Sequence, residues 1–149
     1  MRIIGVDPGL SGAIATLDDG ELIEVHKMPT FTVKTKRTYD LPWITSAIHL
    51  AFADLVAVEA VTRPGSLREN KAFILGVAYG LAIETMTVSS PVWKRHYKIG
   101  ASKEESRAVA MGLWPGFGFD KMNKGADGMW EAALIGRYAY ETRPNQPHQ

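Results

Sequence analysis

The sequence has no cysteine and only four histidines in 149 residues. Without cysteine, the chain has no disulfide, no thiolate zinc site and no cysteine nucleophile. The histidines are scattered along the chain, which disfavours an imidazole metal cluster. We therefore expect any bound metal to be a hard cation held by oxygen ligands.

The chain also lacks long apolar runs, a recognisable signal peptide and a large net charge. Its longest uncharged apolar stretch, residues 72–83, is too short to span a bilayer. We expect a cytoplasmic protein, in the host cytoplasm if a phage encodes it. The net charge of +1 does not by itself indicate a nucleic acid partner. With 46% hydrophobic residues, the composition predicts one globular domain over residues 1–149, with a frayed tail at 144–149.

Apolar runs and turn residues predict an α/β chain. Strands are expected at 1–6, 13–17, 21–28, 55–59 and 87–89, with a hairpin turn at Asp18-Asp19-Gly20. Helices are expected at 40–53, 69–86, 102–113 and 126–140, with a turn or short helix at 91–97 and a capping box at Ser102 and Glu105. Residues 30–38, 63–68 and 114–124 are predicted to be loops. This order predicts a mixed five-stranded sheet, three antiparallel strands followed by parallel strands, with helices on both faces.

Four acidic residues occupy positions that suit a metal site. Asp7 ends the first strand and Glu59 ends the fourth, so parallel pairing of these strands would bring both carboxylates to one sheet edge. Asp127 and Glu131 are four residues apart and share a face of the last helix with apolar residues. Each acid alone is more typical of a solvated strand end or helix start than of a metal ligand. As a group, they predict two-metal phosphodiester hydrolysis, because clustered carboxylates repel one another unless cations neutralise them.

Four segments resemble, in order, the motifs of the RuvC family of Holliday-junction resolvases, and in particular its phage-type members. They are IGVDPGLSG at 4–12, VAVE at 56–59, the basic segment and helix from Trp93 to Ala108, and the acidic helix from Ala126 to Ile135. One departure concerns the last helix. Bacterial members usually close with two aspartates three apart, whereas this chain has Asp127 and Glu131 four apart.

The resemblance implies an RNase H-like fold and a Mg²⁺-dependent endonuclease that cuts four-way or branched DNA by paired nicks of a homodimer. It implies two Mg²⁺ ions per site, for which Mn²⁺ substitutes, and no organic cofactor or membrane partner. The implied metal ligands are Asp7, Glu59, Asp127 and Glu131. It also implies a lysine near the scissile phosphate, for which Lys103 and Lys98 are both candidates.

Two basic runs without any acid, residues 26–38 and 89–102, predict contacts with DNA phosphates. Solvated surface lysines explain each run equally well on its own. Trp93 or Tyr97 is expected to pack on a sugar or base, and the 63–68 loop is expected to enter the junction centre. The predicted DNA-binding residues are Arg63, Arg68, Lys94, Arg95, Lys98, Lys103, Lys34, Lys36 and Arg37.

The segment from Lys71 to Glu84 is apolar on nearly every face of its expected helix. One face can pack on the sheet, so the other face is expected to meet a second copy of the chain. Gly76 and Gly80 would allow two backbones to approach closely. The predicted dimer interface consists of Phe73, Gly76, Val77, Gly80 and Leu81.

Three other functions are compatible with parts of this pattern. The DPGLSG motif at 7–12 also resembles the phosphate loop of acetate kinase-like or hexokinase-like proteins, but those have two large domains. A non-catalytic binder of branched DNA is disfavoured because all four acids are present. An RNase H acting on RNA–DNA hybrids would share the metal site and remains an alternative.

Overall fold

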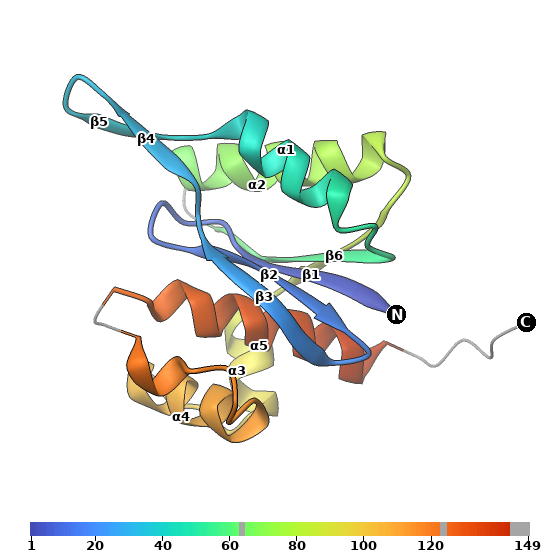
Figure 1. The fold of residues 1–149 in the computed structure, drawn as a ribbon, viewed down its shortest axis with the longest axis vertical. Helices are drawn as coiled ribbons and strands as arrows, with labels where there is room; N and C mark the ends of the chain where they lie inside the picture. The colour runs from blue at the N-terminus through green and yellow to red at the C-terminus, as the bar shows by residue number, and fades with distance from the viewer. Residues whose placement is uncertain (63–64, 123–124, 144–149) are drawn as a thin grey trace, which may run out of the picture.

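The computed structural model describes residues 1–62, 65–122 and 125–143. Its centre is a five-stranded sheet with the order β3-β2-β1-β6-β7 (Figure 1). β1 pairs antiparallel with β2 and parallel with β6, β2 pairs antiparallel with β3, and β6 pairs parallel with β7. The predicted mixed sheet is therefore confirmed. The strands are β1 (Arg2–Asp7), β2 (Ala13–Asp18), β3 (Glu21–Lys27), β6 (Leu55–Glu59) and β7 (Glu84–Val88).

Helices cover both faces of the sheet, as the sequence predicts. α1 (Leu41–Leu50) and α2 (Ser66–Gly80) lie on one face, and α5 (Asp127–Thr142) lies on the other, with α3 (Ser90–His96) and α4 (Lys103–Leu113) beside it (Figure 1). Alternate residues of β1 are buried in two separate cores. Ile3 belongs to the core on the α5 side, and Ile4 and Val6 belong to the core under α1 and α2. An apolar strand between two helical layers is expected to be buried on both faces.

Very close packing of α5 on β1 depends on glycines. A Cβ at Gly5 would lie 2.2 Å from the Ala132 carbonyl oxygen, and a Cβ at Gly136 would lie 2.4 Å from a side-chain carbon of Leu17. No side chain fits there without moving the helix away from the strand. The buried apolar side of α5, which includes Trp130, Ala133 and Ile135, completes this core.

The predicted helix 69–86 and strand 87–89 have the wrong boundaries. α2 ends at Gly80, Ala82 has a left-handed φ of 56°, and the Ile83 amide donates to the Ala78 carbonyl, which closes the helix. The chain then enters β7, which begins at Glu84. In the sequence, the end of α2 and the segment before β7 form one continuous apolar run. Hydrophobic periodicity cannot show where the helix ends within such a run. The predicted 63–68 loop is also wrong from Ser66 onward, because α2 begins there.

The predicted 30–38 loop is a two-stranded hairpin of β4 (Thr30–Val33) and β5 (Lys36–Tyr39). The alternation of Phe31 and Val33 with threonines favours a strand, but the polar and basic residues from 34 to 38 favour a loop. The 114–124 segment contains a short 3₁₀ turn, η1 (Phe119–Lys121).

Two helix caps follow the sequence closely. Asp40 accepts a hydrogen bond from the Trp43 amide at the start of α1, as its position predicts. Ser102 caps α4 by accepting from the Glu104 amide, but Glu105 accepts from the Gly100 amide instead of completing a capping box. In the part of the chain that the structure describes, no helix combines the length and apolar character needed to cross a membrane. The predicted tail at 144–149 lies outside the described residues.

Candidate active site

Two of the predicted acids meet at one edge of the sheet. β1 and β6 are parallel neighbours in register from Ile3 with Leu55 to Val6 with Val58. Asp7 and Glu59 are the next residues of these two strands, so they lie side by side at the strand ends. Open α/β sheets present their functional groups at this edge.

The first turn of α5 brings the other two acids to the same edge. Asp127 is the first residue of α5, and Glu131 lies one turn further along. A Cβ at Gly128 would lie 2.5 Å from the Gly12 Cα, so the helix start packs directly against the loop that follows Asp7. The backbone of Gly12 thus occupies the space that a side chain at position 128 would need.

The electrostatics of this edge show an excess of negative charge. Burial, together with the neighbouring Glu59 and Glu131, raises the pKa of Asp7 to about 6, although the Gly9 amide and Lys103 lower it. Burial also raises the pKa of Glu131, where Lys94 lowers it and Glu59 raises it. Three carboxylates thus share a partly buried region in which their charges are only partly balanced.

Two lysines supply the balancing charge. The Lys103 Nζ lies 2.5 Å from Asp127 Oδ2, and the Lys94 Nζ lies 3.6 Å from Glu131 Oε1. Of the two lysines predicted near the scissile phosphate, the structure brings Lys103 to the acids. Lys98 is exposed on the loop after α3 and forms no ion pair with a described residue.

Trp93 has a different role from the one expected. Its side chain is fully buried, and its Nε1 donates a hydrogen bond of 3.1 Å to Glu59 Oε1. The expected packing of Trp93 on a sugar or base is therefore wrong. Tyr97 is also turned inward, because its hydroxyl donates to Glu141. The sequence contains no signal for the Trp93 contact, since an aromatic residue in a short basic helix is equally compatible with core and surface.

A second positioning contact that the sequence does not indicate holds the turn after Asp7. The Pro8 carbonyl accepts hydrogen bonds from the buried Asn70 Nδ2 at 2.9 Å and the Tyr39 hydroxyl at 3.1 Å. The Gly9 amide donates to Asp7 Oδ1 at 3.1 Å. Three hydrogen bonds therefore fix the backbone and the carboxylate at the end of β1.

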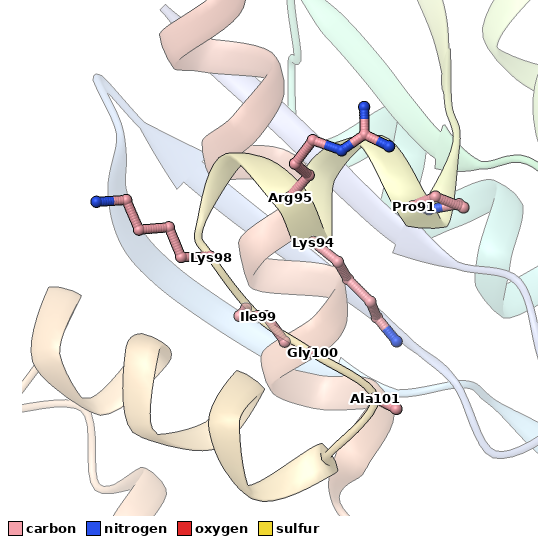
Figure 2. A pocket seen from close by; sticks show the side chains of 7 residues that line it. All are labelled: Pro91, Lys94, Arg95, Lys98, Ile99, Gly100 and Ala101. Atoms are coloured by element: carbon pink, nitrogen blue, oxygen red, sulfur yellow. The ribbon is translucent and has the colours of Figure 1, made fainter.

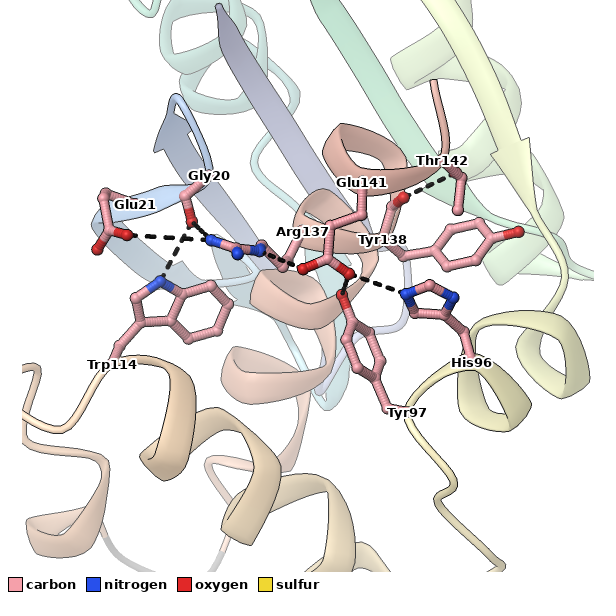
Figure 3. Close-up of polar contacts among 9 residues, drawn as sticks. All are labelled: Gly20, Glu21, His96, Tyr97, Trp114, Arg137, Tyr138, Glu141 and Thr142. Atoms are coloured by element: carbon pink, nitrogen blue, oxygen red, sulfur yellow. Dashed lines mark hydrogen bonds and ion pairs between the residues drawn. The ribbon is translucent and has the colours of Figure 1, made fainter. Parts of the chain in front are cut away.

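A polar network at the far end of α5 anchors α3, which carries Trp93 and Lys94 (Figure 3). Glu141 accepts from His96 at 2.8 Å, from the Tyr97 hydroxyl at 3.2 Å and from Arg137 Nε at 2.6 Å. Arg137 also donates to the Gly20 carbonyl in the β2–β3 turn. The network ties α3, α5 and the sheet together and so fixes the helix that reaches Glu59 and Glu131.

A basic pocket is formed by α3 and the loop that follows it (Figure 2). It has an open volume of about 640 Å³. Lys94, Arg95 and Lys98 point in different directions around it (Figure 2). Lys94 therefore lies between this pocket and Glu131. The pocket is lined by Pro91, Lys94, Arg95, Lys98, Ile99, Gly100 and Ala101.

The remaining predicted DNA contacts lie in three places. Arg68 is exposed in the first turn of α2, and Arg63 lies outside the described residues. Lys34 and Lys36 are exposed on the β4–β5 hairpin. The adjacent Arg37 donates to the Leu10 carbonyl at 2.6 Å, so it also contacts the loop after Asp7.

Within residues 1–62, 65–122 and 125–143, no three Asp, Glu or His side chains are arranged to hold a metal ion as they stand. The ion pairs with Lys103 and Lys94 partly explain why the carboxylates do not converge on a metal position, because each lysine holds one of the acids, Asp127 and Glu131. The donor set itself is entirely carboxylate oxygen, which suits Mg²⁺. The chemistry of the residues therefore fits a divalent cation that replaces the lysines as the neutralising charge.

The mixed sheet with an acidic edge and a closing acidic helix is the RNase H-like fold. Among solved structures, the chain is similar to Thermus thermophilus RuvC in complex with a Holliday junction substrate, with a TM-score of 0.64, 17% identity and coverage of 96% of this chain and 95% of that one. It is also similar to the fowlpox virus Holliday junction resolvase, with a TM-score of 0.62, 15% identity and coverage of 95% and 98%. No family model and no curated protein matches the sequence. Because the sequence identities are low, these similarities establish the fold of the chain and no more than the fold.

Proposed function

We propose that this protein is a structure-selective endonuclease that resolves four-way or otherwise branched DNA by divalent-metal-dependent phosphodiester hydrolysis. One observation carries the proposal. Asp7 is a partly buried carboxyl group with its pKa raised to about 6, next to Glu59 and Glu131, at the functional edge of an RNase H-like sheet. The solved structures similar to it over almost their whole length include two described as Holliday junction resolvases or as bound to a junction.

Asp7, Glu59, Asp127 and Glu131 are the residues proposed to hold two Mg²⁺ ions. When bound, these ions activate a water molecule and stabilise the leaving oxygen. Glu59 is held for this role by Trp93, and Asp7 by the Gly9 amide. Such supporting hydrogen bonds typically orient ligand side chains and tune their affinity.

Lys103 and Lys94 have two proposed tasks. Without a cation, they neutralise Asp127 and Glu131. When a cation binds, both ammonium groups would be free to approach the phosphate of the bound strand. Of the two lysines that the resemblance offers for the scissile phosphate, Lys103 is favoured over Lys98, because it already contacts an acid of the cluster. Lys94 also lines the basic pocket, where Arg95 and Lys98 are placed to bind neighbouring phosphates.

We propose a homodimer through the outer side of α2. Ile74 and Ala78 face the core, whereas a Cβ added at Gly76 or Gly80 would meet no heavy atom of the described chain within 4 Å. Tyr79, which the sequence analysis did not include, is 68% exposed on this side. A two-fold dimer presents two identical sites, which suits paired cuts in two symmetric strands. Gly80→Glu should yield a monomer or aggregate in light scattering, and a clean dimer would place the interface elsewhere.

The central test uses a labelled four-way junction, a linear duplex of the same sequence and an RNA–DNA hybrid. We expect Mg²⁺-dependent nicks in the junction and little cleavage of the duplex. Preferential cleavage of the hybrid would instead assign the RNase H activity. In a parallel thermal melt, Mg²⁺ should raise the melting temperature of the wild type and not that of Asp7→Asn.

A further inference from the structure

The β4–β5 hairpin is a separate two-stranded sheet that stands out from the body of the protein (Figure 1). Every residue from 31 to 37 is exposed. An isolated two-stranded ribbon is only marginally stable in water. A projecting ribbon of this kind therefore needs an anchor at its base, and its tip is available to a partner.

The base is anchored to the loop that follows Asp7. The Tyr39 hydroxyl donates to the Pro8 carbonyl at 3.1 Å, and Arg37 donates to the Leu10 carbonyl at 2.6 Å. The Met28 amide, just before β4, donates to the Gly12 carbonyl at 2.8 Å. The direction of the hairpin is thus set by the same turn that positions the candidate catalytic carboxylate.

The outer face of the hairpin combines apolar and cationic groups. In the register, Phe31 lies opposite Thr38 and Val33 lies opposite Lys36, so these four side chains share one face. Phe31 is 50% exposed and Val33 is 53% exposed. Residues 28–39 contain no acidic side chain, and Lys34 at the turn adds another positive charge. Exposed aromatic and aliphatic groups whose only charged neighbours within residues 28–39 are cations are complementary to a nucleic acid, whose base faces are apolar and whose phosphates are anionic.

We propose that the β4–β5 hairpin binds a duplex arm at the branch point and makes the protein prefer branched over linear DNA. Lys34 and Lys36 contact phosphates, and Phe31 packs against a sugar or an unstacked base. This inference rests on the proposed function, and it adds the element that discriminates between substrates.

The test compares binding to a synthetic four-way junction and to a linear duplex, with Ca²⁺ in place of Mg²⁺. Phe31→Ser is expected to weaken junction binding about 10-fold and duplex binding less than about 2-fold. The double variant Lys34→Asn, Lys36→Ser removes two charges, and asparagine tolerates the left-handed φ of 57° at position 34. It should reduce the slope of log affinity against log salt for the junction by about 1.8. Ile23→Ser is the matched control, because Ile23 is 57% exposed on β3 and is placed in no site.

Three results would overturn the inference. They are an equal loss of junction and duplex binding, an unchanged junction affinity in both variants, or the same loss in Ile23→Ser. A photo-crosslinking phenylalanine analogue at position 31 gives an independent reading, since it should crosslink next to the branch point. Binding of the wild type to phosphatidylserine vesicles that Phe31→Ser abolishes would assign the hairpin to a membrane instead. Wild-type cleavage of the junction with no hairpin effect refutes this inference alone, whereas a wild type that neither binds nor cuts junctions refutes the proposed function as well.

Discussion

The two ends of α5 each place a glutamate among polar neighbours, and the two glutamates are in opposite electrostatic states. Near the start of the helix, burial raises the pKa of Glu131, which forms an ion pair with Lys94 at 3.6 Å. Near the end of the helix, burial raises the pKa of Glu141, but hydrogen bonds from Arg137, His96 and Tyr97 outweigh it and leave the pKa lowered.

This difference separates a site from a structural contact. Glu141 has donors enough to satisfy its charge, so it needs nothing further and stabilises the fold. Glu131 shares its surroundings with Asp7 and Glu59 and lacks enough positive charge. An ionised carboxylate without enough positive charge nearby lowers the stability of the folded state, and binding of a cation from solution reverses that loss. The four predictions below test this contrast, from the largest expected effect to the smallest.

Asp7→Asn should reduce single-turnover cleavage of a junction by about 10³-fold or more, while junction binding in Ca²⁺ holds or improves. Without divalent ions the variant should also be more stable at pH 7 to 8, by at most about 3 kcal/mol. The folded-state pKa of Asp7 is about 6, above the ordinary value of 3.8. Its protonated form therefore favours folding below pH 3.8, and that contribution is lost as the pH rises through 6.

Denaturant melts at pH 4, 6 and 8 check the stability part of this prediction. The stability difference between the variant and the wild type should be largest at pH 8 and absent below about pH 4. Near wild-type cleavage by Asp7→Asn would refute its role in the site.

Glu131→Gln keeps the shape of the side chain and removes its charge. Cleavage should fall by about 10²-fold with partial rescue by Mn²⁺, and stability without divalent ions should stay the same or rise. Single-turnover rates and thermal melts measure the two effects. A rate within a few-fold of wild type would reduce the proposed ligands to Asp7, Glu59 and Asp127.

Glu141→Gln is the matched substitution at the other end of the same helix. It should lower the free energy of unfolding by about 1–2 kcal/mol, because three donors lose a charged acceptor. Cleavage by the folded protein should stay within about 2-fold of wild type. Because the folded-state pKa of Glu141 is lowered, the stability loss should be complete above its ordinary value of 4.5 and shrink as the pH falls below it.

Equal loss of cleavage in Glu131→Gln and Glu141→Gln would remove the distinction between the two ends of α5. An unchanged melting temperature for Glu141→Gln would show that its network does not contribute to stability.

Lys98→Ala should have the smallest effect. Lys98 lines the basic pocket without an ion pair to a described residue, so its removal costs one phosphate contact and no folding energy. The slope of log affinity against log salt should fall by about 0.9 for junction and duplex alike. Fluorescence anisotropy at several salt concentrations measures it, and an unchanged slope would remove Lys98 from the DNA interface.

The sequence predicted the four carboxylates and their common edge, because two apolar strands and one amphipathic helix each carry an acid at a defined position. The resemblance offered two candidate lysines, Lys103 and Lys98, and of these the structure brings Lys103 to the acids. The sequence did not predict the bond from Trp93 to Glu59 or the bonds from Asn70 and Tyr39 to Pro8. These partners lie between 31 and 62 residues apart, and no local pattern marks a hydrogen bond over such a separation.

The β4–β5 hairpin shows where the prediction of secondary structure from sequence fails. Its residues alternate as strand residues do, but every residue from 31 to 37 is exposed, so periodicity carries no signal there. The hairpin exists because Tyr39 and Arg37 reach the loop after Asp7. Between α2 and β7, the left-handed Ala82 ends the helix and pairing with β6 defines the strand, and the apolar run in the sequence marks neither boundary.

The sequence by itself therefore determined the order of the five strands of the central sheet, the helices between them and the positions of the acids, because hydrophobic periodicity and strand-end chemistry are local properties. Only the tertiary structure decided how those acids are balanced. The glycines at positions 5, 12, 128 and 136 let α5 approach β1 and the loop after Asp7. That approach determines which carboxylates lie close enough to Asp7 to change its pKa. A pKa depends on burial and on distances through space, and the order of residues specifies neither.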